Sequence, residues 1–358
     1  MREVKKALLS LVLFSTVHFA QWSTTPSEDT EYTNRGSVVS AIDDYAGGVF
    51  FIHGFTEYSI ERSFAPIFAH INKYGYEITG GVVIETLHDY STEVQIHPSS
   101  DNNLFVSFLG NFIYKYWNGL AVYAGKTAVI KIDTNGYPLW DEPIYAIVDS
   151  TNHQTYELIP DDSGGCFIST SLNYIEINAS YGQKIIQHIS SSGERLWGEQ
   201  GIMIYEGFQA NGLQFFPPKI HQRSDNNLFV YVVTNLSSSF EIHLFSYDGE
   251  QLLNTKYTPD RRFFNTFLTT DDELLVLTYD NTGGFSAHNL ILGTCIVVND
   301  TITFIDSTLL QQVNSSIYHT HSTIDKKNNI HLLWRIDDDN EGLLSYYKKI
   351  TNVPNGLY

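Results

Sequence analysis

Asp101-Asn-Asn-Leu-Phe-Val recurs unchanged as Asp225-Asn-Asn-Leu-Phe-Val, far along the same chain. Related stretches lie before, between and after these two, and each pairs a polar turn with an apolar, strand-like run. They are Asp44-Tyr-Ala-Gly-Gly-Val-Phe-Phe-Ile, Asp162-Ser-Gly-Gly-Cys-Phe-Ile, Asp272-Glu-Leu-Leu-Val-Leu and Asp325-Lys-Lys-Asn-Asn-Ile-His-Leu-Leu. The leading Asp residues are 57, 61, 63, 47 and 53 positions apart. This irregular period is typical of a repeat architecture whose loops vary in length.

A second turn follows the first in most repeats. It appears as Ile71-Asn-Lys-Tyr-Gly-Tyr-Glu-Ile, Ile132-Asp-Thr-Asn-Gly-Tyr-Pro-Leu-Trp, Ile189-Ser-Ser-Ser-Gly-Glu-Arg-Leu-Trp and Phe245-Ser-Tyr-Asp-Gly-Glu-Gln-Leu-Leu. The fifth repeat is the weakest match, with Ile296-Val-Val-Asn-Asp-Thr-Ile-Thr-Phe and no Gly. Two hairpins give four antiparallel strands, which is one propeller blade. The sequence therefore predicts an all-β, six-bladed β-propeller of four-stranded antiparallel blades, starting near residues 37, 93, 155, 216, 264 and 317.

The N-terminus predicts export. Arg2, Lys5 and Lys6 precede an apolar run that is too short to span a bilayer, so residues 1–20 are expected to be a signal peptide cleaved after Ala20. Residues 21–358 then form a single propeller domain. The mature N-terminal segment 21–31 is expected to supply the outer strand of blade six and close the ring, since Gln21-Trp22 resembles the continuation missing after Tyr358. The expected location is secreted, cell-surface or periplasmic.

The amino-acid composition limits which classes of partner the protein can bind. The chain has 21 Lys and Arg against 40 Asp and Glu, a net charge of −19. This balance excludes binding to nucleic acid through phosphates, and favours divalent cations or basic partners. No second apolar stretch reaches membrane-spanning length, and a monomer is expected. Cys166 and Cys295 fall in blades three and five, too far apart for a disulfide, and are expected to be free, buried thiols.

The Gly-x-x-Leu-Trp unit resembles the tandem repeats of secreted bacterial β-propellers, including the PQQ-like superfamily. The resemblance covers nearly the whole mature chain and implies architecture only. A quinoprotein dehydrogenase of that superfamily would usually have eight blades, quinone and calcium ligands and often a vicinal disulfide, whereas this chain has no adjacent cysteines and no recognisable cofactor motif. No cofactor is therefore expected.

Candidate ligand residues come from the face that carries the loops between strands two and three of the blades. The longest such loop, in blade two, contains Tyr114, Tyr116, Trp117 and Tyr123, whose flat rings suit stacking on a sugar or a peptide. Tyr174 and Phe215 complete the predicted ligand set. The alternative is an insertion hairpin that buries its own aromatic side chains.

The Asp-led turns belong to the opposite face, where their carboxylates are expected to bond their own backbone. Calcium at Asp43-Asp44 or Asp161-Asp162 is the alternative, because paired carboxylates suit a hard cation. No metal site is predicted from any other cluster.

The function predicted from the sequence is an exported, non-catalytic binding module for a glycan, peptide or protein. One alternative is a glycoside hydrolase or lyase with carboxylates on the ligand face, using pairs such as Glu85 with Asp89 or Glu176 with Asp149. Another is a module of a larger surface assembly.

Overall fold

The structure is a computed structural model. It describes residues 38–54, 66–83, 92–117, 120–148, 153–176, 179–208, 217–235, 239–257, 261–280, 288–298, 300–313, 317–324, 327–338 and 342–350. Residues 1–37 lie outside these ranges, and with them the predicted signal peptide and closing strand 21–31. No helix in the described part of the chain is long and apolar enough to cross a membrane.

All described elements are β-strands. The first sheet contains β1 (Val38–Asp43), β2 (Val49–Gly54), β3 (Pro66–Ile71) and β4 (Glu77–Val83). The second contains β5 (Thr92–Pro98), β6 (Leu104–Trp117), β7 (Leu120–Ile132) and β8 (Ile144–Tyr145), and the third β9 (His153–Pro160), β10 (Cys166–Glu176), β11 (Ala179–Ile189) and β12 (Ile202–Phe208).

The later sheets follow the same plan. The fourth contains β13 (Lys219–Gln222), β14 (Leu228–Asn235), β15 (Ser239–Phe245) and β16 (Gln251–Tyr257). The fifth contains β17 (Arg261–Leu268), β18 (Leu274–Asp280), β19 (His288–Val298) and β20 (Thr301–Val313), and the sixth β21 (Ile317–Ile324), β22 (Ile330–Asp338) and β23 (Gly342–Ile350).

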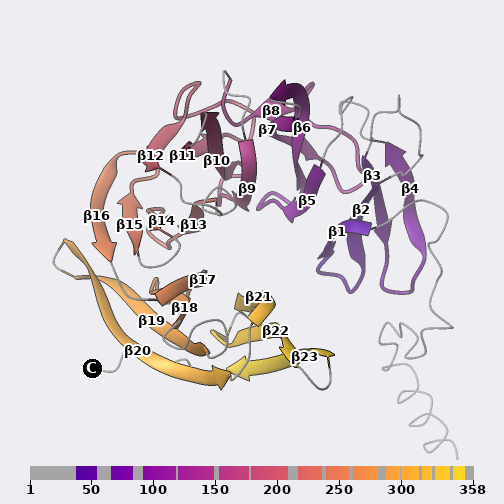
Figure 1. Cartoon of the computed structure of the whole chain (residues 1–358). Helices are drawn as coiled ribbons and strands as arrows, with labels where there is room; N and C mark the ends of the chain where they lie inside the picture. Colours follow the sequence, from indigo (N-terminus) through magenta and orange to yellow (C-terminus); the bar gives the residue numbers. More distant parts are fainter. Residues whose placement is uncertain are drawn as a thin grey trace, which may run out of the picture. The chain divides into compact units, whose positions relative to one another are not determined.

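Neighbouring strands in each sheet are also consecutive in the chain, as Figure 1 shows for β17 to β20. The pairing is antiparallel, and the second and third sheets are linked by the single residue pair Gly125–His153. Five four-stranded sheets and a sixth with three described strands confirm the predicted fold class, an all-β chain of propeller blades.

The turn between the first two strands of every sheet has a positive φ at one shared position despite its varied sequence. Each turn is counted from Asp44, Ser99, Asp161, Arg223, Thr269 or Asp325. The third residue after that start has positive φ in all six sheets: Gly47, Asn102, Gly164, Asn226, Asp272 and Asn328. Gly, Asn and Asp are the residues that adopt this left-handed region most readily. The Gly-Gly and Asn-Asn versions of the repeat are therefore two solutions to one backbone requirement.

By contacts, the chain divides into two compact units. Unit 1 is Met1–Ile113 with Ala128–Tyr145, and unit 2 is Tyr114–Thr127 with Ala146–Tyr358. The predicted single domain over 21–358 stays a prediction.

Within each unit, the hydrophobic core lies between successive sheets. In unit 1, Phe50 and Phe68 of the first sheet pack with Val106 and Ile130 of the second. In unit 2, one cluster joins the third and fourth sheets, and another joins the fourth and fifth. Both cysteines are buried in unit 2 and neither forms a disulfide; Cys166 lies in the third sheet and Cys295 in the fifth.

The glycine of the second turn is needed for this packing. Gly136 has φ +87°, and a Cβ added to it would lie 2.5 Å from Phe68 Cδ1. We expect Gly136→Ala to lower the free energy of unfolding by about 2–4 kcal/mol, because it combines left-handed strain with a steric clash. Urea denaturation measures this loss.

Gly198 supplies the control for this prediction. It has φ +78° and no atom within 4 Å of an added Cβ. Gly198→Ala should therefore cost only about 1 kcal/mol, the conformational part of the effect. Equal losses in the two variants would show that the contact with Phe68 contributes nothing.

Candidate functional site

The predicted aromatic residues lie in strands and not in a loop. The structure places Tyr114, Tyr116 and Trp117 in β6 and Tyr123 in β7, so these strands extend the hairpin of the second sheet almost to its tip. The prediction of a long loop was wrong, because the aromatic and β-branched residues that flank Asn118-Gly119 have high strand propensity and favour continued pairing. This backbone agrees with the alternative of an insertion hairpin.

The side chains of the predicted ligand residues lie outside the described part of the structure. Tyr174 is in β10, Phe215 falls in the range 209–216, and the ligand role of the whole set stays a prediction. Of the acid pairs proposed for hydrolysis, Glu85, Asp89 and Asp149 are also outside the described residues.

Asp44, Asp101 and Asp225 bond the backbone of their own turns, as predicted. Asp272 instead accepts a hydrogen bond from Ser224 N in the preceding sheet, and in the third sheet Asp161 takes the role expected of Asp162. Asp161 Oδ1 accepts hydrogen bonds from the backbone N–H groups of Ser163 at 2.7 Å and Gly165 at 2.6 Å. Asp44 Oδ1 makes the equivalent bonds in the first sheet.

The remaining oxygen of each carboxylate faces a histidine on the third strand. Asp44 Oδ2 lies 2.9 Å from His70 Nε2, and Asp161 Oδ2 lies 2.8 Å from His188 Nε2. Both oxygens of Asp44 and Asp161 therefore have protein partners, which gives the calcium alternative no support. Within the described ranges, no group of three or more His, Cys, Asp or Glu residues could hold a metal ion.

Polar side chains gather instead on the first strands of three sheets in unit 2. These first strands are in contact with one another, β13 with both β9 and β17. In a propeller the first strand of each blade lies nearest the central channel. We call Glu157, Lys219, His221 and Thr266 the inner-strand cluster.

Two polar contacts join this cluster across the sheets. Lys219 Nζ lies 3.1 Å from Glu157 Oε1, with 27% and 25% of the two side chains exposed. His221 Nε2 lies 2.7 Å from Thr266 Oγ1. Both side chains are therefore partly exposed, although Glu157 Oε2 is itself buried.

Further hydroxyl and amino groups lie behind the cluster. Ser169, paired with Glu157 across β9 and β10, donates its hydroxyl to Pro218 O at 2.5 Å. Lys184, paired with Ser171 across β10 and β11, is fully buried and donates from Nζ to Ser171 Oγ at 2.7 Å. Ser169 and Ser171 lie in β10 and Lys184 in β11, so these groups come from the two strands that follow β9 in the third sheet.

The protein environment shifts the acid–base properties of these groups. Burial raises the pKa of Glu157, although Lys219 opposes that shift. Burial and the nearby Lys219 charge lower the pKa of His221 to about 3, and burial lowers the pKa of Lys184 to about 7. Perturbed pKa values grouped in this way are typical of functional sites.

Sequence reasoning missed the inner-strand cluster. The sequence does contain one indication of the cluster, because Glu157 and Lys219 are charged residues inside strand-like runs. Nothing in the sequence showed that they pair, because they are 62 positions apart.

Comparisons with known proteins address the fold. No protein-family model matches the chain, and no curated protein matches it in sequence. A solved polysaccharide lyase of family PL25, an ulvan lyase, is similar in structure, with a TM-score of 0.54 and 10% identity over 88% of this chain and 79% of that one. The same similarity holds for that lyase bound to -[GlcA(1-4)Rha3S]-. A Dyadobacter fermentans protein of unknown function gives a TM-score of 0.51 at 9% identity, over 88% and 95% of the two chains.

The chain is thus similar in structure to β-propeller proteins that include a carbohydrate-active enzyme. At this level of identity the likeness concerns the fold. The PQQ-like resemblance is accordingly supported for propeller architecture alone.

Proposed function

We propose that the protein is an exported, non-catalytic β-propeller that binds a neutral glycan at the inner-strand cluster. The observation that carries the proposal is the partly exposed Glu157–Lys219 pair on adjacent first strands. A carboxylate accepts hydrogen bonds and an ammonium group donates them, so together they match the hydroxyl groups of a sugar ring. The net charge of −19 disfavours an anionic polysaccharide.

Binding without cleavage is supported by the partners of the charged groups. Hydrolysis of a glycosidic bond usually needs two carboxyl groups about 5–10 Å apart. The charged partner of Glu157 is the cation Lys219 and not a second carboxyl group. Lys184 is fully buried, so Lys184 cannot reach a polymer. The second candidate is a polysaccharide lyase or hydrolase, favoured by the raised pKa of Glu157, which would suit a general acid.

A glycan-array screen of the mature protein tests the proposal, followed by incubation with each bound polysaccharide. We expect retention on at least one neutral glycan, with no shortening of the chain and no unsaturated product in ultraviolet absorbance. Cleavage that is lost in Glu157→Gln would establish the enzyme instead. Failure to bind any glycan would contradict the proposal.

Substitutions at the pair give a quantitative prediction. Glu157→Gln and Lys219→Met should each weaken glycan binding by about 10–100-fold, the effect of losing one charge-assisted hydrogen bond. Isothermal titration measures the change. Glu241 and Lys256, an ion pair at 3.4 Å on β15 and β16, provide matched controls. Equal losses in Glu241→Gln and Lys256→Met would place the ligand elsewhere.

A further inference from the structure

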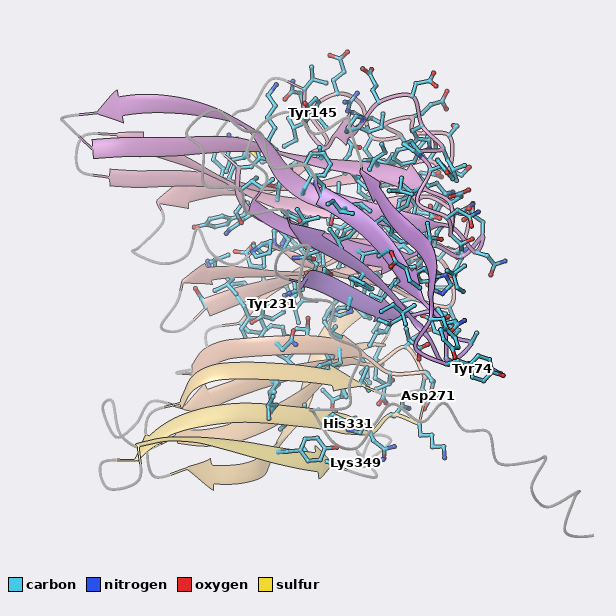
Figure 2. All side chains as sticks on the ribbon, turned by 90° about the vertical axis from the view of Figure 1, so that its right-hand side faces the viewer. Tyr74, Tyr145, Tyr231, Asp271, His331 and Lys349 are labelled. Carbon is cyan, nitrogen blue, oxygen red and sulfur yellow. The ribbon has the colours of Figure 1, made fainter. Side chains whose placement is uncertain are left out.

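Unit 1 exposes three tyrosine rings on two neighbouring turns of its first sheet. Tyr45 is 74% exposed in the β1–β2 turn, and Tyr74 and Tyr76 are 56% and 71% exposed in the β3–β4 turn. Figure 2 shows Tyr74 projecting away from the ribbon at the tip of its turn. We call Tyr45, Tyr74 and Tyr76 the tyrosine turn surface.

The two turns lie side by side. A Cβ added to Gly47 would be 3.2 Å from Lys73 Cβ, and one added to Gly48 would be 2.8 Å from Asn72 Cα. The tyrosines of both turns therefore belong to one continuous surface, formed within the first sheet alone.

The backbone under each ring is fixed by a side-chain hydrogen bond. Tyr45 N donates to Asp43 Oδ1 at 2.6 Å. Asn72 Oδ1 accepts from Tyr74 N at 2.9 Å and from Tyr76 N at 3.1 Å. A surface held in this way loses little conformational entropy when it binds a partner.

The charge around the rings favours a cation. Asp43, two residues before Tyr45, and Glu77, next to Tyr76, are exposed. Lys73 Nζ already lies 5.1 Å from the centre of the Tyr74 ring, so a cation sits over one of these rings in the chain itself. Aromatic faces attract cations, and flanking carboxylates add to that attraction.

We propose that the tyrosine turn surface binds a lysine- and arginine-rich segment of a partner polypeptide. The partner's cationic side chains lie over the rings of Tyr45, Tyr74 and Tyr76, and its charge is complementary to that of Asp43 and Glu77. This interaction is independent of the proposed glycan function, because it uses different residues in a different unit.

The test measures binding of an oligolysine peptide and its ε-acetylated form to the full mature protein. Wild-type protein should bind the charged peptide and lose it on acetylation. Each Tyr→Leu change at positions 45, 74 and 76 should weaken binding by about two- to fivefold, and the triple variant by about 10–100-fold. Tyr→Phe changes should have little effect, because they keep the ring.

These variants leave the net charge unchanged, so general attraction between an acidic protein and a basic peptide cannot produce the loss. Tyr347→Leu on β23, where the ring is 62% exposed, is the matched control and should bind like wild type. Lys73→Met should strengthen binding a few-fold, because it removes a competing cation and a like charge.

Equal binding of the charged and acetylated peptides would overturn the proposal, as would wild-type affinity in the triple Tyr→Leu variant. Weaker binding in the triple Tyr→Phe variant would also overturn it, since the hydroxyl groups would then be the recognised feature. If wild-type protein fails to bind oligolysine but still binds the glycan, the proposed peptide site is wrong and the proposed glycan function is unaffected.

Discussion

Asp161→Ala is expected to lower the free energy of unfolding by about 3–5 kcal/mol, as removal of one member of a buried charged network does. The Asp161 side chain is 1% exposed. Besides two backbone N–H groups, it accepts hydrogen bonds from His188, which lies 2.8 Å away, and from the Tyr247 hydroxyl at 3.1 Å. Because Tyr247 belongs to the fourth sheet, the substitution breaks the turn of the third sheet and a contact between two sheets.

The same site predicts a dependence on pH. Burial alone would raise the pKa of Asp161, but the hydrogen bonds from His188, the turn backbone and Tyr247 outweigh it, and the pKa is lowered. The stabilisation is therefore present above the unfolded-state pKa and is lost as pH falls towards the folded-state pKa. Urea denaturation across acidic pH measures both effects.

Asp162→Ala, at the exposed neighbour, should change stability by less than about 0.5 kcal/mol. A similarly small loss in Asp161→Ala would contradict the account.

Lys184→Met is expected to stabilise the protein, in contrast to Asp161→Ala. It should raise the free energy of unfolding by about 1–4 kcal/mol at pH 6. Lys184 has no exposed surface, and burial lowers its pKa from 10.5 to about 7. Below pH 7 the folded protein must hold a buried ammonium group, whose desolvation costs free energy. Methionine has a similar length and carries no charge.

The pH dependence distinguishes this mechanism from better packing. Between about pH 7 and 10.5 the unfolded chain keeps a proton on Lys184 that the folded protein has lost, so wild-type stability gains a contribution that rises with pH. The advantage of Lys184→Met should therefore shrink across this range. Lys256→Met, on a side chain that is 57% exposed, should not change the slope. A constant advantage at every pH would attribute the gain to packing alone.

The repeat predicted much of the fold because its turns are local. The positive φ of Asn102 and Asn226, and of Gly136 in the second turn, follows from residues within a few positions of each turn. Even the weak fifth repeat was predicted correctly, with Asp300 at φ +56° in place of Gly. Four strands per repeat follow once both turns are recognised.

The candidate site was not predictable in the same way. Glu157 pairs with Lys219, and His221 with Thr266, only because first strands of successive sheets are neighbours. Such contacts depend on tertiary packing, which turn chemistry does not encode. Aromatic composition instead drew attention to the hairpin around Trp117, whose residues extend two paired strands.

The most direct test of the central claim is amide hydrogen exchange of the full mature protein with and without a saturating neutral glycan identified on the array. If the ligand lies on the inner-strand cluster, β9, β13 and β17 should gain protection, while the outer strands β16 and β20 stay unchanged. Protection confined to the β6–β7 hairpin around Trp117, with no change in β9 and β13, would contradict the account and place the ligand on the aromatic hairpin.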